Sequence, residues 1–185
     1  VNKGISLQGL GRGQEAIQSF GRAIVLDSNN AEAHYNKGIA LASLGKVKEA
    51  IESYNTPIKL DDKMVKAYYN KGFGFVHLGK EENALECFEQ VIEMCPEDSE
   101  AFCNKGICLE IFGRHQQATE AYYQAIKFSS EPENFVLYCY KAVSLASLED
   151  YQQAIEILDK VKSHNEIIEV LYNKAAAKAT EILTL

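Results

Sequence analysis

A fixed period of 34 residues organises most of this chain. The tripeptide Asn-Lys-Gly occurs at 2–4, 36–38, 70–72 and 104–106, so that each copy begins 34 residues after the previous one. Alanines keep the same step at 16, 50, 84 and 118, and Ala154 follows after a slip of two residues. A period of roughly 20 to 50 residues is typical of repeat architectures, in which each unit buries its apolar face against its neighbours. The period therefore constrains the fold more than any local propensity does.

Each unit has the pattern of two amphipathic helices joined by a turn. Apolar residues recur three and four positions apart, and no segment shows the period-two alternation of a β-strand, which predicts an all-α fold. Glycines stand between the paired segments at 11, 45, 79 and 113, where a left-handed residue can end a helix. The fifth unit has Glu149 and Asp150 instead, so we expect its turn to close differently. The expected helices are 1–10, 13–26, 31–44, 47–60, 65–78, 81–94, 99–112, 115–128, 135–148, 151–163 and 166–185.

One proline interrupts this pattern. Pro57 lies inside the expected helix 47–60 and lacks the amide that would bond the Ser53 carbonyl. Such a loss is worth about 3 kcal/mol in a helix interior. We expect the helix to kink or to end early there.

The residues of these units resemble the tetratricopeptide repeat family over nearly the whole chain. In the third unit the matching residues are Tyr68, Lys71, Gly72, Phe75, Ala84, Phe88 and Pro96. The resemblance implies a right-handed superhelical solenoid of antiparallel helix pairs that forms one domain over 1–185. The expected parts are a partial repeat 1–30, repeats 31–64, 65–98, 99–134 and 135–167, and a terminal helix 168–185. The start without Met and the incomplete end units lead us to expect a fragment of a longer chain.

The resemblance also implies a concave groove lined by the first helix of each pair, the A helix, which would hold a peptide of a partner protein. The residues expected to bind the peptide are Tyr35, Asn36, Ile39, Lys66, Tyr69, Asn70, Phe73, Cys103, Asn104 and Ile107; Glu110, Tyr140 and Val143 map to the same face. The asparagines would form a ladder for a peptide backbone, and the aromatic rings would be apolar anchors. Two alternatives stay open: each Asn bonds within its repeat, and the tyrosines pack between adjacent A helices.

A chaperone-tail clamp is not expected in this groove. In the family that clamp captures a carboxylate with Lys, Arg and two Asn side chains. The Asn positions of the clamp hold Ile39, Phe73 and Ile107 here, and Lys66 is the one cation in the middle of the groove. Removing these donors removes the charge-assisted hydrogen bonds that hold a carboxylate.

Two other functions compete with peptide binding. Segment 166–185 carries Ile167, Ile168, Leu171, Ile182, Leu183 and Leu185 without a following helix to cover them. An uncovered solenoid end favours self-assembly into a homo-oligomer through 166–185. The second alternative is an accessory regulatory module of a larger protein, which only sequence beyond both ends of the expected fragment would reveal.

Composition and motifs argue against the remaining classes. The net charge of −7 disfavours nucleic-acid and anionic-membrane partners, and no apolar run approaches the length of a membrane span. Five cysteines without a CxxC pair indicate reduced thiols and a cytoplasmic location rather than a disulfide framework or a metal site. No nucleophile, base and oxyanion donor can be assigned, so we expect no enzyme activity, no metal and no cofactor.

Overall fold

The computed structural model describes residues 1–130 and 134–160 together with Val170 and Asn173. The chain divides into two compact units, unit 1 over Val1–Met94 and unit 2 over Cys95–Leu185. The unit boundary coincides with the end of the last helix of the 65–98 repeat. Each unit is described by itself below.

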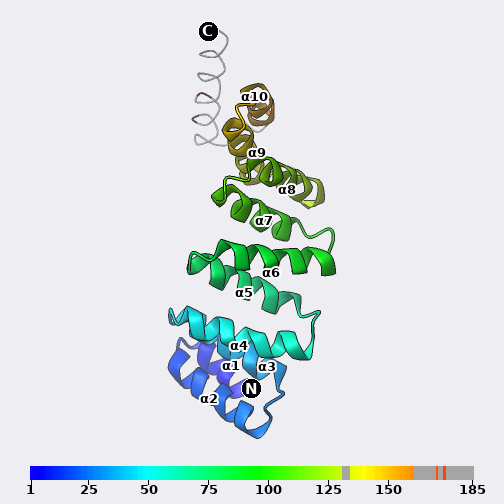
Figure 1. Ribbon diagram of the computed structural model, residues 1–185. Coiled ribbons are helices and arrows are strands. Elements are labelled where there is room, and N and C mark those ends of the chain that lie inside the picture. Colours follow the sequence, from blue (N-terminus) through cyan, green and yellow to red (C-terminus); the bar gives the residue numbers. More distant parts are fainter. Residues whose placement is uncertain (131–133, 161–169, 171–172, 174–185) are drawn as a thin grey trace. The chain divides into compact units, whose positions relative to one another are not determined.

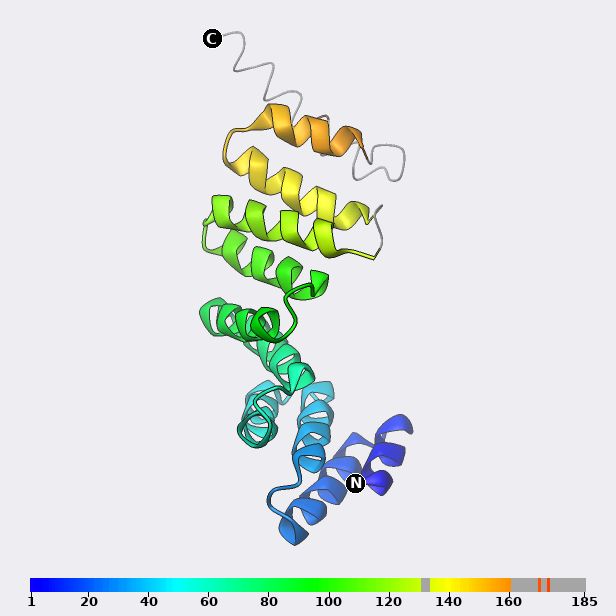
Figure 2. The same ribbon diagram turned by 90° about the vertical axis from the view of Figure 1, so that its right-hand side faces the viewer.

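Unit 1 consists of three antiparallel helix pairs. Its helices are α1 (Asn2–Gly9), α2 (Gly13–Leu26), α3 (Ala31–Ser43), α4 (Val47–Leu60), α5 (Val65–His77) and α6 (Glu81–Met94). Within the unit every helix packs against the next one in the chain, as Figures 1 and 2 show from two sides. The A helices α3 and α5 are also in contact with each other.

Unit 2 continues the same pattern with two pairs. Its described helices are α7 (Ser99–Ile111), α8 (His115–Phe128), α9 (Phe135–Ser147) and α10 (Tyr151–Asp159). No strand occurs in the described parts of the two units, which confirms the predicted all-α fold of antiparallel helix pairs. The first nine helices begin and end within one residue of their predicted bounds, and α10 ends four residues earlier than predicted. Within the predicted terminal helix the structure describes only Val170 and Asn173, both helical and exposed, and the apolar residues named for self-assembly lie outside the described residues.

The repeated glycine of each A helix faces an aromatic ring of its own helix pair. Figure 1 shows the paired helices side by side, and the facing residues are Gly4 with Phe20, Gly38 with Tyr54, Gly72 with Phe88 and Gly106 with Tyr122. A Cβ atom at any of these glycines would lie less than 3.0 Å from the ring. All four rings are buried. The glycine is therefore required because the helix backbone approaches the ring too closely for any side chain.

The last described pair solves the same packing problem with other residues. At the position of the glycine it has Ala142, and at the position of the ring it has Leu158. Both side chains are buried in one apolar cluster with Leu145 and Ala154. A slightly larger residue on α9 is thus matched by a smaller one on α10, which preserves the volume at the contact.

The interhelix turns are alike in every described pair. Gly11, Gly45, Gly79 and Gly113 have φ between +64° and +74°. In the second pair the Lys46 amide donates to the Leu41 carbonyl at 2.9 Å and the Gly45 amide to the Ala42 carbonyl at 2.9 Å, which together form a Schellman motif.

The turn of the fifth pair corrects a prediction. Glu149 adopts φ +63°, and the Asp150 amide donates to the Leu145 carbonyl at 3.0 Å, as in the glycine turns. The expectation that this turn closes differently was wrong. The helix ends require the left-handed residue whatever its type, so Glu149 accepts a backbone conformation that disfavours a side chain.

Pro57 does not end its helix. Helix α4 continues to Leu60, and the amide of Asp61 donates to the Pro57 carbonyl at 2.9 Å. The expected early end was therefore wrong. Pro57 lies one turn from the end of α4 and its ring is buried, so apolar packing of the ring offsets part of the loss of the amide hydrogen bond.

Candidate functional site

Two neighbouring A helices of unit 1 carry seven of the ten predicted binding residues. Helix α3 supplies Tyr35, Asn36 and Ile39, and α5 supplies Lys66, Tyr69, Asn70 and Phe73. Spacings of three and four residues place the members of each set on one helix face. Because α3 and α5 are in contact, the structure brings these seven residues together on one surface of unit 1.

An aromatic cluster forms the apolar part of this surface. Tyr69 stacks on Phe73 with ring centroids 6.0 Å apart, and both rings contact Phe88 of α6 at 6.1 Å and 5.6 Å. Tyr35 contacts Tyr54 in the same way at 6.0 Å. Phe73 nevertheless remains 42% exposed. The cluster is anchored in the core of unit 1 through Phe88 and leaves the Phe73 ring partly exposed.

A hydrogen bond links the two A helices across this surface. The Asn70 side-chain amide donates to the Tyr35 hydroxyl at 3.1 Å. Burial raises the pKa of Tyr35, and the bond from Asn70 acts in the opposite direction. At Asn70 the bond therefore joins two repeats of unit 1, whereas the alternative considered from sequence was a bond within one repeat.

The other three predicted residues, Cys103, Asn104 and Ile107, lie on α7 of unit 2 and are half-buried. The side-chain nitrogen of Asn104 is buried without a hydrogen-bond partner. Burial raises the pKa of the Cys103 thiol to about 11, with the charge of Glu100 acting in the same direction. A thiol with such a pKa is a poor nucleophile near neutral pH, so Cys103 fits a packing or contact role.

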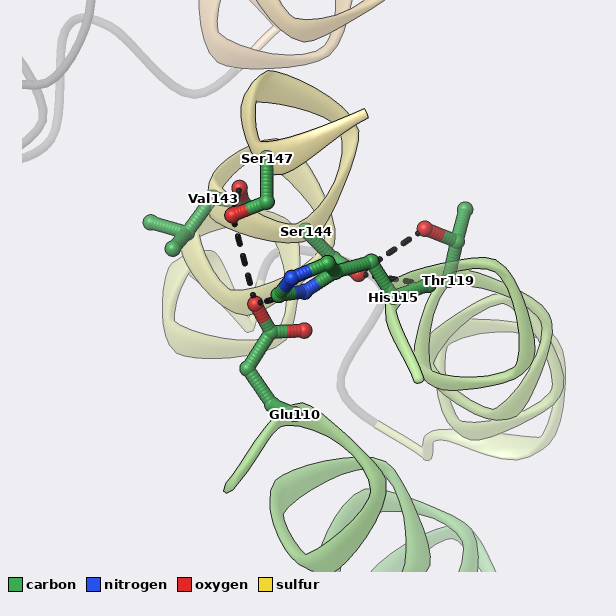
Figure 3. A network of polar contacts seen from close by, with 6 residues as sticks. All are labelled: Glu110, His115, Thr119, Val143, Ser144 and Ser147. Atoms are coloured by element: carbon green, nitrogen blue, oxygen red, sulfur yellow. Dashed lines mark hydrogen bonds and ion pairs between the residues drawn. The ribbon is translucent and has the colours of Figure 1, made fainter. Parts of the chain in front are cut away.

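A polar network of unit 2 was not predicted from sequence. It joins the end of α7, the start of α8 and α9, and Figure 3 shows its side chains. Glu110 Oε1 accepts from His115 Nδ1 at 2.8 Å and from the Ser147 hydroxyl at 3.4 Å. The Ser144 hydroxyl donates to the His115 carbonyl at 2.8 Å and accepts from the Thr119 hydroxyl at 3.0 Å. The network therefore runs from a buried serine to a carboxylate on the A-helix side.

A sequence signal for this network existed in the repeat alignment. Glu110 occupies the position that holds Ala42 and Val76 in the two preceding units, and Ser144 follows Gly74 and Cys108 at its own position. Polar residues had replaced small or apolar ones at two positions of one junction. Only the packing of the three helices shows that Glu110 and Ser144 both contact His115.

Helix α9 presents an apolar stripe that continues the A-helix face of unit 2. Val136, Tyr140 and Val143 are spaced four and three residues apart and are 41%, 38% and 41% exposed. Tyr140 stacks on Tyr122 with centroids 5.5 Å apart. Ser147 stands one turn beyond Val143 and contacts Glu110, so the stripe ends at the polar network.

A second apolar surface of unit 1 lies away from the predicted residues. Val25 and Leu26 at the end of α2 are exposed and, with Arg22 and Lys37, line an open hollow of about 820 Å³. Its sequence signal is the run of apolar residues 23–26, because the counterparts of Val25 in the next two units are the charged residues Lys59 and Glu93.

Sites of other kinds were also sought. Within residues 1–130 and 134–160, no group of three or more His, Cys, Asp or Glu side chains is placed to hold a metal ion. Among the described helices, none has the length and apolar character needed to cross a bilayer. None of the five cysteines forms a disulfide, and Cys87 and Cys108 are buried.

Four sequence models of repeats match the chain. A model described as a TPR repeat matches residues 10–45, and three described as tetratricopeptide repeats match residues 31–64, 65–98 and 87–120. Together they span residues 10–120. The comparison with curated proteins gave no match.

Solved structures of repeat proteins share the fold. YrrB, titled a TPR protein with an unusual peptide-binding site, is 22% identical over 94% of this chain and 90% of its own, with a TM-score of 0.82. MamA of Desulfovibrio magneticus RS-1 is 24% identical over 88% of this chain and 90% of its own, with a TM-score of 0.79. PilF of Pseudomonas aeruginosa is 19% identical over 95% of this chain and 81% of its own, with a TM-score of 0.75.

Proposed function

Because this chain belongs to the tetratricopeptide-repeat family, we propose that it is a non-catalytic scaffold that binds a peptide segment of another protein on the exposed faces of its A helices. The observation that carries the proposal is the surface of unit 1, where a partly exposed aromatic cluster lies beside polar amide groups. The fold is shared with YrrB, whose title describes a peptide-binding site. Residues 1–185 would act as one array of repeats.

The chemistry of the surface fits an apolar side chain of a peptide. The Phe73 ring is partly exposed, and Tyr69 and Phe88 hold it in place. A ring held in this way binds without losing much rotational freedom, which favours affinity. A groove of this kind supports micromolar binding, about −8 kcal/mol.

The polar side chains would orient the peptide backbone. Asn70 and Tyr35 are already joined by a hydrogen bond, so their orientation is fixed before a peptide arrives. Asn36 and Asn104 occupy the same repeat position on α3 and α7. Amide side chains can donate to and accept from a backbone without selecting particular side chains. We propose that Tyr35, Asn36, Ile39, Lys66, Tyr69, Asn70, Phe73, Cys103, Asn104 and Ile107 contact the peptide.

We place this function in a reducing compartment, the cytoplasm. The support is chemical: five cysteines without a disulfide among them are compatible with a compartment that keeps cysteines reduced. The location would be tested by expressing the chain as a reporter fusion and detecting the fusion in cell fractions. Recovery of the chain in an oxidising compartment would contradict it.

The test of the function is selection from a library of random displayed peptides. The parent chain is compared with Tyr69→Ala, Asn70→Ala, and with a control that removes the same residue types from exposed positions of B helices, Asn83→Ala, Tyr123→Ala. We expect the parent and the control to enrich one common motif and the test variant to lose it. Because Tyr69 and Phe73 both pack on Phe88, Phe73→Ser provides a second variant that removes the exposed ring and keeps the contact between Tyr69 and Phe88.

Thermal unfolding of all four proteins accompanies the selection, so that a loss of binding is not confused with a loss of fold. Absence of any enriched motif in the parent would contradict peptide binding. Equal enrichment by parent, Phe73→Ser and the double variant would place the binding surface elsewhere on the chain.

A further inference from the structure

The two oxygens of the Glu110 carboxylate have different surroundings. Oε1 accepts hydrogen bonds from His115 and Ser147, whereas Oε2 is buried and has no partner (Figure 3). An unpaired buried acceptor costs about 1–3 kcal/mol and more when the group is charged. The side chain as a whole is 23% exposed, although Oε2 itself is buried, so a ligand can reach Glu110 at its exposed part. The carboxylate is therefore incompletely satisfied within the chain itself.

The neighbours of Glu110 contact only one of its two oxygens. His115 Nδ1 and the Ser147 hydroxyl both donate to Oε1, and neither reaches Oε2. The contact to Ser147 is long at 3.4 Å. A cation of a partner would supply a charged donor to this carboxylate once the side chain turns Oε2 toward the surface.

An apolar surface leads directly to this carboxylate. Val136, Tyr140 and Val143 form the exposed stripe of α9, and the next turn carries Ser147, which contacts Glu110. The stripe spans about 10 Å along the helix, since each residue rises about 1.5 Å. Tyr140 is held in place by its stack on Tyr122.

The charge of the chain is concentrated in the same unit. Residues 1–94 carry 11 Lys and Arg against 12 Asp and Glu, a net charge of −1, whereas residues 95–185 carry eight against 14, a net charge of −6. A unit with this balance attracts a positively charged segment and repels an acidic one. The local and the overall charge of unit 2 therefore favour the same kind of partner.

We propose that unit 2 selects a basic and apolar peptide segment: a Lys or Arg side chain of the partner binds the Glu110 carboxylate, and neighbouring apolar side chains bind the stripe of Val136, Tyr140 and Val143. This inference rests on the proposed function and adds to it the chemistry of the partner. It is opposite in sign to capture of a carboxylate tail.

The test uses the full chain and the random displayed library. The parent is compared with Glu110→Gln and with Glu156→Gln, a control that makes the same change at an exposed glutamate of α10. We expect the parent and the control to enrich peptides with Lys or Arg at a fixed distance from apolar residues. In Glu110→Gln the apolar positions should persist and the basic position should become random.

One enriched peptide is then synthesised with its basic residue and with Gln in its place. The loss of a charge-assisted hydrogen bond should weaken binding to the parent about tenfold and binding to Glu110→Gln less than about twofold. If Glu110 had a purely structural role, Glu110→Gln would bind both peptides more weakly than the parent does, by the same factor. The variant would then also have a lower melting temperature.

The outcomes separate this inference from the proposed function. Enriched peptides that depend on Phe73 and Tyr69 but carry no basic position would leave peptide binding in place and overturn the role of Glu110. The role of Glu110 is also overturned if replacing the basic residue of the peptide with Gln weakens binding to the parent and to Glu110→Gln by the same factor. Absence of all enrichment would overturn both proposals.

Discussion

Units 1 and 2 differ at an equivalent junction between a B helix and the next A helix, α4 with α5 in unit 1 and α8 with α9 in unit 2. In unit 1 the A helix α5 brings Gly74 against α4, where a Cβ atom on the glycine would lie 2.8 Å from Ile51 Cγ1 and 3.6 Å from Val47 Cγ1. In unit 2 the equivalent Ser144 of α9 is completely buried and hydrogen-bonds to Thr119 and His115 of α8. One junction is an apolar close contact and the other is a hydrogen-bonded one.

The difference shows that helix pairing does not determine the chemistry of the junction. Both junctions join a B helix to the next A helix at the same repeat positions, yet only the polar one extends to a carboxylate on the A-helix face. Apolar contacts tolerate shape errors poorly, whereas hydrogen-bonded ones fail when a single partner is removed. Each junction should therefore respond to a different kind of substitution.

The largest expected effect comes from giving unit 1 the serine of unit 2. Gly74→Ser should lower the free energy of unfolding by about 3 kcal/mol, because its Cβ overpacks the contact with Ile51. Adding Ile51→Thr should make the double variant more stable than the sum of the two single changes by about 1 kcal/mol. Urea unfolding of the four proteins measures this coupling, and strictly additive effects would show that the junctions are not equivalent.

A smaller effect is expected from breaking the polar junction. Ser144→Ala leaves the Thr119 hydroxyl without its acceptor and should cost about 2 kcal/mol. Thr119→Val in the same chain removes that hydroxyl, so the double change should be less harmful than the sum of its parts. Ser147→Ala, at the exposed end of the network, is the control. Equal losses for Ser144→Ala and Ser147→Ala would contradict the importance of the buried pair.

The two units also differ in the residue that takes the left-handed backbone conformation of an interhelix turn. Unit 1 closes its turns with glycine, whereas Glu149 in unit 2 has φ +63°. Glu149→Gly should raise the free energy of unfolding by about 1 kcal/mol, because a side chain disfavours this conformation. Gly113→Glu should have the opposite effect. An unchanged or lowered melting temperature for Glu149→Gly would indicate that Glu149 makes a compensating interaction.

The smallest effect is expected from the buried Cys87 thiol of unit 1, which should lower the free energy of unfolding at alkaline pH. Burial raises the pKa of the Cys87 thiol to about 11, from an ordinary value of 9.0, and nearby Lys71 opposes the shift. Because the folded-state pKa is the higher one, the stability due to the protonated thiol is fully present below about pH 9 and is lost as the pH rises toward about 11.

At pH 9.5 the loss from this thiol should be about 0.8 kcal/mol. Cys87→Ala removes the titrating group, so the difference in stability between parent and variant should shrink between pH 8 and 9.5 by about that amount. Urea unfolding at several pH values measures it. Parallel curves for the two proteins would mean that the thiol is not buried in solution.

Most of the fold could be predicted because the 34-residue period places equivalent helices and turns at equivalent positions of each unit. The period fixed the helix pairs and their turns, and the bounds of nine helices followed from the apolar pattern. The early helix end expected at Pro57 and the different turn expected at Glu149 were wrong, because a local preference was given too much weight. At both places the surrounding helix pair imposes the backbone, and a single residue accepts the strain or the missing bond.

Less of the site could be predicted, because contacts between repeats depend on packing. The period placed Tyr35 and Asn70 on A helices, but the hydrogen bond between them requires α3 and α5 to be neighbours. The carboxylate of Glu110 was mapped to the groove without its partners His115 and Ser147. Those contacts come from three different helices, and no spacing along the chain encodes them.

The glycine and the ring that faces it constrain how such a chain can change by recombination. The two residues always belong to one helix pair and lie 16 positions apart, as Gly106 and Tyr122 do. Duplication or loss of a whole unit keeps each pair together. A crossover between the A and B helices of the last two described pairs would instead set Ala142 against an aromatic ring, so viable exchanges should fall between units and not within them.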